Sequence, residues 1–219
     1  MLEYKGIKIR WLGHDAFLLE KDLKIVIDPY RLSKHIEADM VLLSHDHFDH
    51  MSAEDLERVS SNKTVIVAAK ECIDKIGKLQ CREKISLLPG EEKTVNGIKI
   101  KGIAAYNTNK INPDTKKPFH PKEDNKVGFL INIDNTIIYH TGDSDLVPEM
   151  SNLQPDVLLV PVSGTYVMTA GEAAQAVDAI KPKIAIPMHF GTIVGSIEDA
   201  REFKNAVTWC EVHIPTREP

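Results

Sequence analysis

Short runs of apolar residues, separated by turn residues, run along the first quarter of the chain. Some alternate with polar residues at a period of two and others are almost continuously apolar, and both patterns are typical of β-strands. The predicted strands are IKIRWL (7–12), AFLLE (16–20), KIVID (24–28) and DMVLLS (39–44). After the last of these, Ser52 followed by Asp55 is a helix start signal. The chain therefore begins as a strand meander and then changes to strand–helix alternation.

The same alternating and continuous runs of apolar residues recur in the rest of the chain. Further strands are predicted at TVIVAA (64–69), ISLLPG (85–90), IKIKGIAAY (98–106), VGFLINI (127–133), TIIYHTG (136–142), DVLLVPV (156–162), KIAIPMHF (183–190) and WCEVHI (209–214). Helices are predicted at ECIDKIGKL (71–79), after the capping box of Thr169 and Glu172, and after Ser196. Residues 107–125 form a polar loop too long for a simple connector, and we interpret its lysines, such as Lys110, as solvated.

The order of these elements predicts the fold class. Strand hairpins followed by strand–helix alternation occur in both halves of the chain, which favours an α/β fold with two mixed sheets faced by helices. No composition shift and no linker rich in Pro, Gly or Ser divides the 219 residues, so we predict one domain over residues 1–219.

Composition and charge narrow the classes of function. Hydrophobic residues at 42% and charged residues at 27% are typical of a soluble globular protein, and no apolar run has the length of a membrane span. The net charge of −5 disfavours a general nucleic-acid binder. The three cysteines are far apart and form no C-x-x-C pair, so a reducing, cytoplasmic location is expected. The sequence leaves open whether the chain forms a homo-oligomer.

The candidate chemistry lies in the segment HDHFDH, which directly follows the apolar run DMVLLS. Residues two apart in an extended segment point the same way, so His45 and His47 can bind one cation together. The chain then bends and turns Asp49 and His50 toward a second position. Imidazoles and carboxylates are the ligands that zinc and similar divalent ions prefer. The alternative interpretation, a polar loop that only caps a helix, does not account for three histidines at this spacing.

This segment resembles the H-x-H-x-D-H signature of the metallo-β-lactamase superfamily. YHTGDSD and IPMHFGT agree with the resemblance in order and context. GHDAFLLE, IVIDPY, AYNTNK and FHPK are similar to one branch, which includes the L-ascorbate-6-phosphate lactonases and many metal-dependent hydrolases. The resemblance implies a four-layer αβ/βα sandwich of two mixed β-sheets with helices on the outer faces.

The resemblance also implies a set of metal ligands and one or two divalent ions per chain. Zinc is the expected metal, with manganese and iron as alternatives. The first ion would be bound by His45 and His47 and the second by Asp49, His50 and His189, with Asp143 between the two. The oxygen-reducing branch of the superfamily has a glutamate in place of His47, so hydrolysis is favoured over redox chemistry.

One position departs from the superfamily pattern. Where the first ion normally receives another histidine, this chain has Asn107. The first site is then looser, filled by an extra water, or completed by His120 from the long loop. Two other residues have open roles. His14 is either an ordinary turn residue or a substrate contact, and Asp28 either caps a turn or accepts the ring N–H of a ligand histidine.

The ligand set predicts a metal-dependent hydrolase that activates hydroxide for attack on a small anionic ester, lactone or phosphoester. Asp49 would orient the nucleophile, and His140 or a metal-bound water would protonate the leaving group. One alternative is a metal-dependent nuclease acting on RNA or DNA, which the acidic net charge disfavours. The other is a non-catalytic metal-binding or sensing protein, suggested by Asn107.

Overall fold

A computed structural model describes residues 1–218, and these residues form two units. The first unit comprises Met1–Leu87 together with the end of the chain from Pro215, and the second comprises Leu88–Ile214. Each unit contains one seven-stranded sheet. Each sheet begins with antiparallel strands and continues with parallel strands, so the units repeat one pattern.

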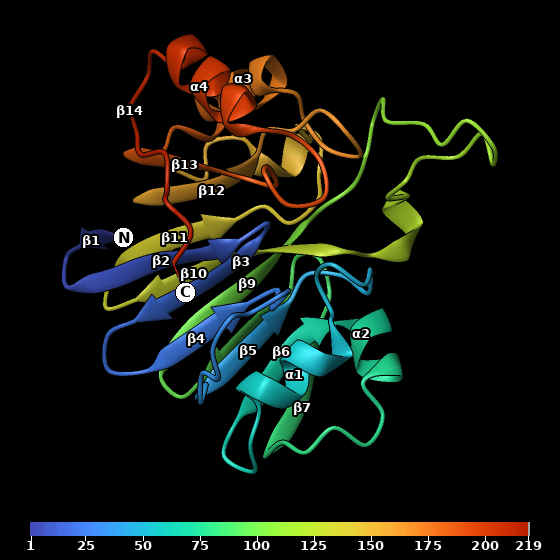
Figure 1. The fold of residues 1–219 in the computed structure, drawn as a ribbon, viewed down its shortest axis with the longest axis vertical. Coiled ribbons are helices and arrows are strands. Elements are labelled where there is room, and N and C mark those ends of the chain that lie inside the picture. The colour runs from blue at the N-terminus through green and yellow to red at the C-terminus, as the bar shows by residue number, and fades with distance from the viewer. Residues whose placement is uncertain (219) are drawn as a thin grey trace. The chain divides into compact units, whose positions relative to one another are not determined.

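In the first unit the strands lie side by side in the order of the sequence (Figure 1). They are β1 (Leu2–Tyr4), β2 (Ile7–Gly13), β3 (Ala16–Glu20), β4 (Lys24–Ile27), β5 (Met40–Leu43), β6 (Val65–Ala69) and β7 (Glu83–Leu87). Pairing is antiparallel from β1 to β4 and parallel from β4 to β7. The parallel connections contain α1 (Ala53–Val59) and α2 (Lys70–Lys75), and α2 packs on β6 and β7.

The second unit has the spatial order β14-β13-β12-β11-β10-β9-β8 (Figure 1). Its strands are β8 (Glu92–Val95), β9 (Ile98–Ala104), β10 (Val127–Ile133), β11 (Thr136–His140), β12 (Val157–Pro161), β13 (Ile184–Met188) and β14 (Glu211–Val212). Pairing is antiparallel from β8 to β11 and parallel from β11 to β14. The helices α3 (Ala170–Ile180) and α4 (Ile197–Ala206) pack on each other, and η1 (Lys122–Asp124) and η2 (Pro148–Met150) are short 3-10 turns.

The hydrophobic pattern explains which strands are buried. All four residues of β5 and all five of β6 are buried, as the continuous apolar runs predict. In the edge hairpin, β2 buries Ile7 and Ile9 and exposes Lys8 between them. Each fully buried aliphatic side chain contributes roughly 1.5–3 kcal/mol to stability. The sheets are therefore rigid platforms for the loops at their strand ends.

The predicted helix caps are confirmed. The Ser52 side chain accepts a hydrogen bond from the Asp55 amide at the start of α1. Thr169 with Glu172, and Ser196 with Asp199, form complete capping boxes at the starts of α3 and α4.

Two element boundaries differ from the prediction. The helix predicted over 71–79 is the shorter α2, and Gly77 just beyond it has a φ of +46°, a left-handed value that ends a right-handed helix. The strand predicted over 209–214 is only the two-residue β14, since its ladder with β13 joins just Ile184 to Glu211 and Ala185 to Val212. The strands β1 and β8 were not predicted.

Two mixed sheets with helices confirm the predicted α/β fold class. None of the helices in residues 1–218 is both long enough and apolar enough to cross a bilayer. That the whole chain forms one domain remains a prediction.

Candidate functional site

The predicted site residues of each unit lie where strands end. In the first unit β5 ends at Leu43, and the segment from His45 to His50 follows. In the second unit Asp143 follows the end of β11, and His189 comes directly after β13. The carboxyl ends of strands are the edge at which α/β sheets place ligand-binding groups. Each unit thus carries its own set of candidate metal ligands.

The histidines of the first unit are packed against one another. The ring centroids of His45 and His50 are 4.0 Å apart, and those of His45 and His47 are 4.5 Å apart. His45 and His50 are buried. His45 offers a ligand atom within 4.8 Å of one on His47 and of one on His50. Imidazoles this close together can share a divalent cation.

Asp28 controls the proton positions of two of these histidines. Its Oδ2 accepts the hydroxyl proton of Ser44 at 2.5 Å and the Nδ1–H of His50 at 2.9 Å. Because the Ser44 hydroxyl has only one proton, its oxygen accepts from the Nδ1–H of His45, 3.0 Å away. Both rings are thereby held with the proton on Nδ1 and the lone pair on Nε2, the form that binds metal. The sequence did not single out Ser44.

His14 and Asp15 lie beside the same histidines. His14 Nε2 is 3.0 Å from Asp49 Oδ2, and Asp15 Oδ2 is 3.5 Å from His50 Nε2. His14, Asp15 and His50 each offer a ligand atom within 4.8 Å of the others. Asp15, which is fully buried, was missed in the sequence, although its position next to His14 in the segment GHD was a signal for it.

Three of the predicted site residues have left-handed backbone conformations. The φ angles are +53° at His14, +43° at Asp28 and +59° at His189. A positive φ is uncommon in residues other than glycine, and such strain persists where the surrounding structure fixes it. Each of these residues sits at a turn directly after a strand, so the strain sets the direction of the side chain.

The second unit gathers an aspartate and two histidines. Asp143 Oδ2 is 3.4 Å from His189 Nε2 and 3.5 Å from His120 Nε2, and all three residues are buried. The Ser163 hydroxyl donates to the Thr165 carbonyl, so its oxygen accepts from the Nδ1–H of His189 at 2.9 Å. Ser163 thus orients His189, a role that the sequence did not suggest.

These contacts test whether the second-unit residues fit a metal ion. His120 and His189 direct the Nε2 lone pairs of their rings toward one carboxylate oxygen, and three electron-pair donors repel one another unless a cation lies among them. A proton on one imidazole would satisfy only one of the two contacts, whereas a divalent cation bound by all three groups satisfies both. Imidazole nitrogens with a carboxylate oxygen are a donor set that suits zinc and its neighbours.

Asn107 lies at the start of the long loop, and its side chain contacts His120. The Asn107 Oδ1 accepts hydrogen bonds from the backbone N–H of His120 at 2.9 Å and from its Nδ1–H at 3.0 Å. The Asn107 Nδ2 donates to the Tyr166 carbonyl at 2.9 Å. These three bonds also establish which amide atom is oxygen and which is nitrogen.

The residues after Asn107 are held by the GDSD segment and by α3. Asp145 Oδ2 accepts the backbone N–H of Thr108 and of Asn109, at 2.6 and 3.1 Å. Lys110 was predicted to be solvated, but this is wrong, because its Nζ is held by both carboxylate oxygens of Glu172 at 2.7 and 2.9 Å. Its side chain is only 13% exposed. The first residues of the long loop are therefore held by hydrogen bonds to the segment after β11 and to α3.

The contact between Lys110 and the Glu172 carboxylate should depend on pH. Burial raises the pKa of Glu172, but hydrogen bonds from Lys110 and from the Thr169 backbone outweigh it and lower that pKa to about 2. A lowered carboxyl pKa stabilises the fold above about pH 4.5, and this contribution is lost as the pH falls toward 2. We expect Glu172→Gln to flatten the decline in unfolding free energy between pH 5 and 3, measured by urea denaturation. Glu202→Gln, on the exposed side of α4, is the control and should keep the wild-type decline.

His140 differs from the other histidines in its hydrogen bond. It is buried at the end of β11, and its Nδ1 accepts the backbone N–H of Gly142 at 3.1 Å. A neutral ring in this arrangement carries its proton on Nε2 and is a proton donor there. This tautomer is the opposite of the one found in His45, His50, His120 and His189.

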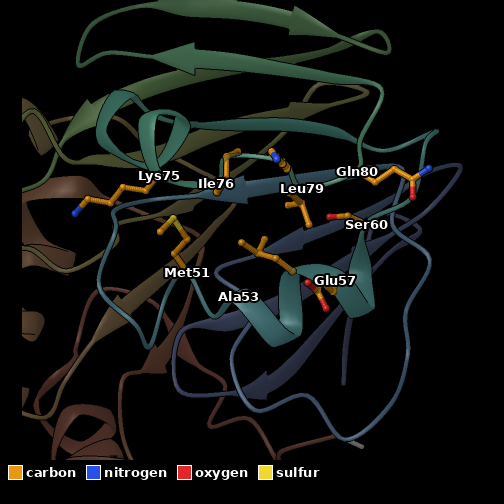
Figure 2. A pocket seen from close by; sticks show the side chains of 10 residues that line it. Met51, Ala53, Glu57, Ser60, Lys75, Ile76, Leu79 and Gln80 are labelled. Carbon is orange, nitrogen blue, oxygen red and sulfur yellow. The ribbon is translucent and has the colours of Figure 1, made fainter.

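An open pocket of about 560 Å³ lies between α1 and the segment after α2 (Figure 2). Its lining is apolar at Met51, Leu56, Ile76 and Leu79. Lys75, on its rim, forms an ion pair with Asp46 of the HDHFDH segment. None of the residues that line it is a predicted metal ligand, but Met51 directly follows His50, so the pocket borders the HDHFDH segment.

The chain is similar to known proteins over most of its length. The family model described as "Beta-lactamase superfamily domain" matches residues 8–189. A protein named metal-dependent hydrolase from Archaeoglobus fulgidus is 30% identical over 216 residues, which cover 92% of this chain and 90% of the relative. A metal-dependent hydrolase from Thermococcus kodakarensis is 32% identical and covers 92% of each chain.

A solved structure agrees with these relatives. The crystal structure of a protein described as a metal-dependent hydrolase from Parabacteroides distasonis has a TM-score of 0.81 and 28% identity, with coverage of 98% of this chain and 96% of that one. Igni18, a metallo hydrolase from Ignicoccus hospitalis, has a TM-score of 0.78 at 24% identity, and this likeness shows the shared fold.

Proposed function

Because this chain belongs to the metallo-β-lactamase superfamily, we propose that it is a metal-dependent hydrolase of small anionic esters, lactones or phosphoesters. The observation that carries the proposal is the convergence of His120 Nε2 and His189 Nε2 on Asp143 Oδ2, at 3.5 and 3.4 Å. The names of the relatives from Archaeoglobus and Thermococcus support the same reaction class. The proposal includes the cytoplasmic location expected from the cysteine pattern.

In this proposal each unit contributes candidate metal ligands of its own. They are His45, His47, Asp49 and His50 of the first unit, and His120, Asp143 and His189 of the second. We assign them one or two divalent ions, with zinc as the first choice. When bound, such an ion supplies a Lewis acid that lowers the pKa of water from 15.7 to ~7 and polarises a carbonyl or phosphoryl oxygen.

The protein's own groups prepare the ligands. Asp28 and Ser44 keep the lone pairs of His45 and His50 on Nε2, and Ser163 does the same for His189. Such outer hydrogen bonds orient ligand rings and raise their basicity. The ligands are thereby fixed before a metal binds, so little reorganisation is needed on binding.

Asp49 and His140 have the proposed roles in proton transfer. His14 donates from Nε2 to one carboxylate oxygen of Asp49 at 3.0 Å, which orients Asp49 toward the nucleophile. His140 carries its proton on Nε2 and is our candidate for protonating the leaving group. A protein with a net charge of −5 suits an anionic substrate only through a local cationic centre, which bound divalent ions would supply.

Metal removal tests the proposal. We expect the purified protein to contain one or two divalent ions per chain, measured by elemental analysis, and to hydrolyse members of a panel of p-nitrophenyl acetate, simple lactones, p-nitrophenyl phosphate and bis-p-nitrophenyl phosphate. Chelation should abolish the activity, and added zinc should restore it, because the ion supplies the Lewis acid.

Two further results would reject the proposal. One is hydrolysis that persists at the same rate in chelated protein, and the other is inactivity of the metal-loaded protein on the whole panel. His35→Ala, which removes an exposed histidine outside the ligand segments, is the matched control and should keep the wild-type metal content.

A further inference from the structure

We propose that Asn107 is a positioning residue that holds His120 as a metal ligand, and that this pair replaces the histidine expected at position 107. The inference rests on the proposed function, in which His120 binds metal. It concerns only residues of the second unit, and it is argued from the hydrogen bonds between Asn107 and His120 and from the 3.5 Å distance between His120 Nε2 and Asp143 Oδ2.

Asn107 and His120 are joined by three hydrogen bonds. The Asn107 backbone N–H donates to the His120 carbonyl at 2.8 Å. In return the Asn107 Oδ1 accepts the His120 backbone N–H at 2.9 Å and its Nδ1–H at 3.0 Å. The first and last parts of the long loop are thereby fastened together, and the imidazole of His120 cannot rotate without breaking the bond at Nδ1.

This arrangement fixes the tautomer of His120. An amide oxygen has no proton to donate, so the Nδ1 of His120 must carry the proton in the pair. The lone pair of a neutral ring is then on Nε2, which lies 3.5 Å from Asp143 Oδ2. Only a deprotonated ring nitrogen can bind a metal ion. Asn107 therefore presents His120 in the form in which it can act as a ligand.

The same bonds argue against Asn107 as a ligand itself. A carbonyl-type oxygen has two lone pairs, and the Asn107 Oδ1 accepts two hydrogen bonds from His120. Its amide nitrogen donates to the Tyr166 carbonyl and has no lone pair to offer. A histidine at position 107 would have no oxygen to accept both hydrogen bonds from His120. Asparagine at this position therefore acts by holding His120 and not by binding the metal itself.

Neighbouring residues support the Asn107–His120 clamp, by which we mean these two residues and the three hydrogen bonds between them. Asp145, two residues after Asp143, accepts the backbone N–H groups of Thr108 and Asn109. The ring of Phe119 packs edge-on against Tyr166, with centroids 4.7 Å apart. Thr108, next to Asn107, and Phe119, next to His120, are thus both held by contacts within the second unit. Asn107 itself is only 4% exposed.

The tautomer of His120 in metal-free protein tests the clamp directly. We expect long-range nitrogen–proton NMR at pH 8 to show His120 with its proton on Nδ1 in the wild type, the signal being assigned with His120→Ala. Asn107→Ala should move the proton of the neutral ring toward Nε2, because Asp143 Oδ2 is then the acceptor that remains beside the ring. Asn107→Asp keeps the acceptor oxygen and should restore the wild-type tautomer. Asn109→Ala, whose amide instead bonds Glu172, is the matched control and should change nothing.

Zinc titration against a competing chelator provides the second measurement. We expect Asn107→Ala to weaken zinc binding by about 10–100-fold, the usual effect of removing a partner that orients a ligand histidine. The double variant with His120→Ala should bind no more weakly than His120→Ala alone, because Asn107 acts through His120. If alanine prevents folding, Asn107→Leu fills the same volume without an acceptor.

Different outcomes separate this inference from the proposed function. An unchanged His120 tautomer in Asn107→Ala would overturn the clamp, whether or not the protein binds metal. A changed tautomer with unchanged zinc affinity would overturn the positioning of a ligand. A wild-type protein that binds zinc but hydrolyses nothing would overturn the proposed function alone.

Discussion

Asp28→Ala is expected to lower the free energy of unfolding by about 3–5 kcal/mol, the usual cost of removing one partner from a buried charged network. The buried Asp28 carboxylate accepts the Ser44 backbone N–H, the Ser44 hydroxyl and the Nδ1–H of His50. Alanine leaves these donors buried without an acceptor, at about 1–3 kcal/mol each where they do not relax. Urea denaturation measures the change.

The same substitution should weaken zinc binding, because His50 loses its acceptor and the Ser44 hydroxyl, without Asp28 to accept its proton, is no longer held as the acceptor for His45. A decrease of about 10–100-fold is expected for lost partners of ligand histidines. Asp28→Asn tolerates the left-handed backbone and fills the same volume, so it should be more stable than the alanine variant but still bind zinc weakly.

The control for the backbone is Asp134→Ala. Asp134 has a φ of +49°, close to the +43° of Asp28, but it lies in an exposed turn. Its replacement should cost only the roughly 1–2 kcal/mol of an alanine in the left-handed region. If Asp28→Ala costs no more than Asp134→Ala, the hydrogen-bond network around Asp28 does not stabilise the fold.

Gly128→Ala is expected to destabilise the protein by about 1–3 kcal/mol, the usual effect of adding a methyl group to a closely packed site. A Cβ at position 128 would lie 2.6 Å from the Thr141 carbonyl oxygen and 2.7 Å from that of His140. These are backbone atoms, so the end of β11 must move, and Asp143 follows its last residue, His140, by three positions. Zinc affinity should therefore fall together with stability.

Gly171→Ala is the matched control for this change. Gly171 lies in α3, and a Cβ there meets no atom within 4 Å. Alanine in a helix is favoured over glycine by roughly 0.5–1 kcal/mol, so this variant should be as stable as the wild type or more so. Thermal and urea unfolding of both variants measure the difference, and equal stability of the two would show that β10 and β11 can separate at this position.

Much of the fold follows from local patterns in the sequence. The runs at 39–44 and 64–69 are strands because they are too apolar for anything but a buried site, and Thr169 and Ser196 begin helices because their oxygens satisfy amides that the helix leaves unpaired. The extents of α2 and β14 were harder to predict, since one depends on the conformation of Gly77 and the other on ladder partners in β13.

Some of the candidate site could be predicted for the same local reason. The spacing of His45, His47, Asp49 and His50 within one short segment has a direct meaning for metal binding. Ser44 and Ser163 could not be singled out, because they belong to the site only through hydrogen bonds to Asp28 and His189. Asp15 has a signal in its position next to His14, but only its contact with His50 places it in the site.

The sequence by itself determined the α/β class and the residue types at the strand ends, because periodicity and close spacing are properties of consecutive residues. The superfamily was indicated by the resemblance of its motifs to a known signature. Only the tertiary structure decided what Asn107 does. It lies thirteen positions before His120, and the loop that closes between them makes the amide oxygen an acceptor for His120. Which nitrogen of each ring carries the proton was likewise decided by partners such as Asp28, since a tautomer is set by the hydrogen bond that the other nitrogen makes.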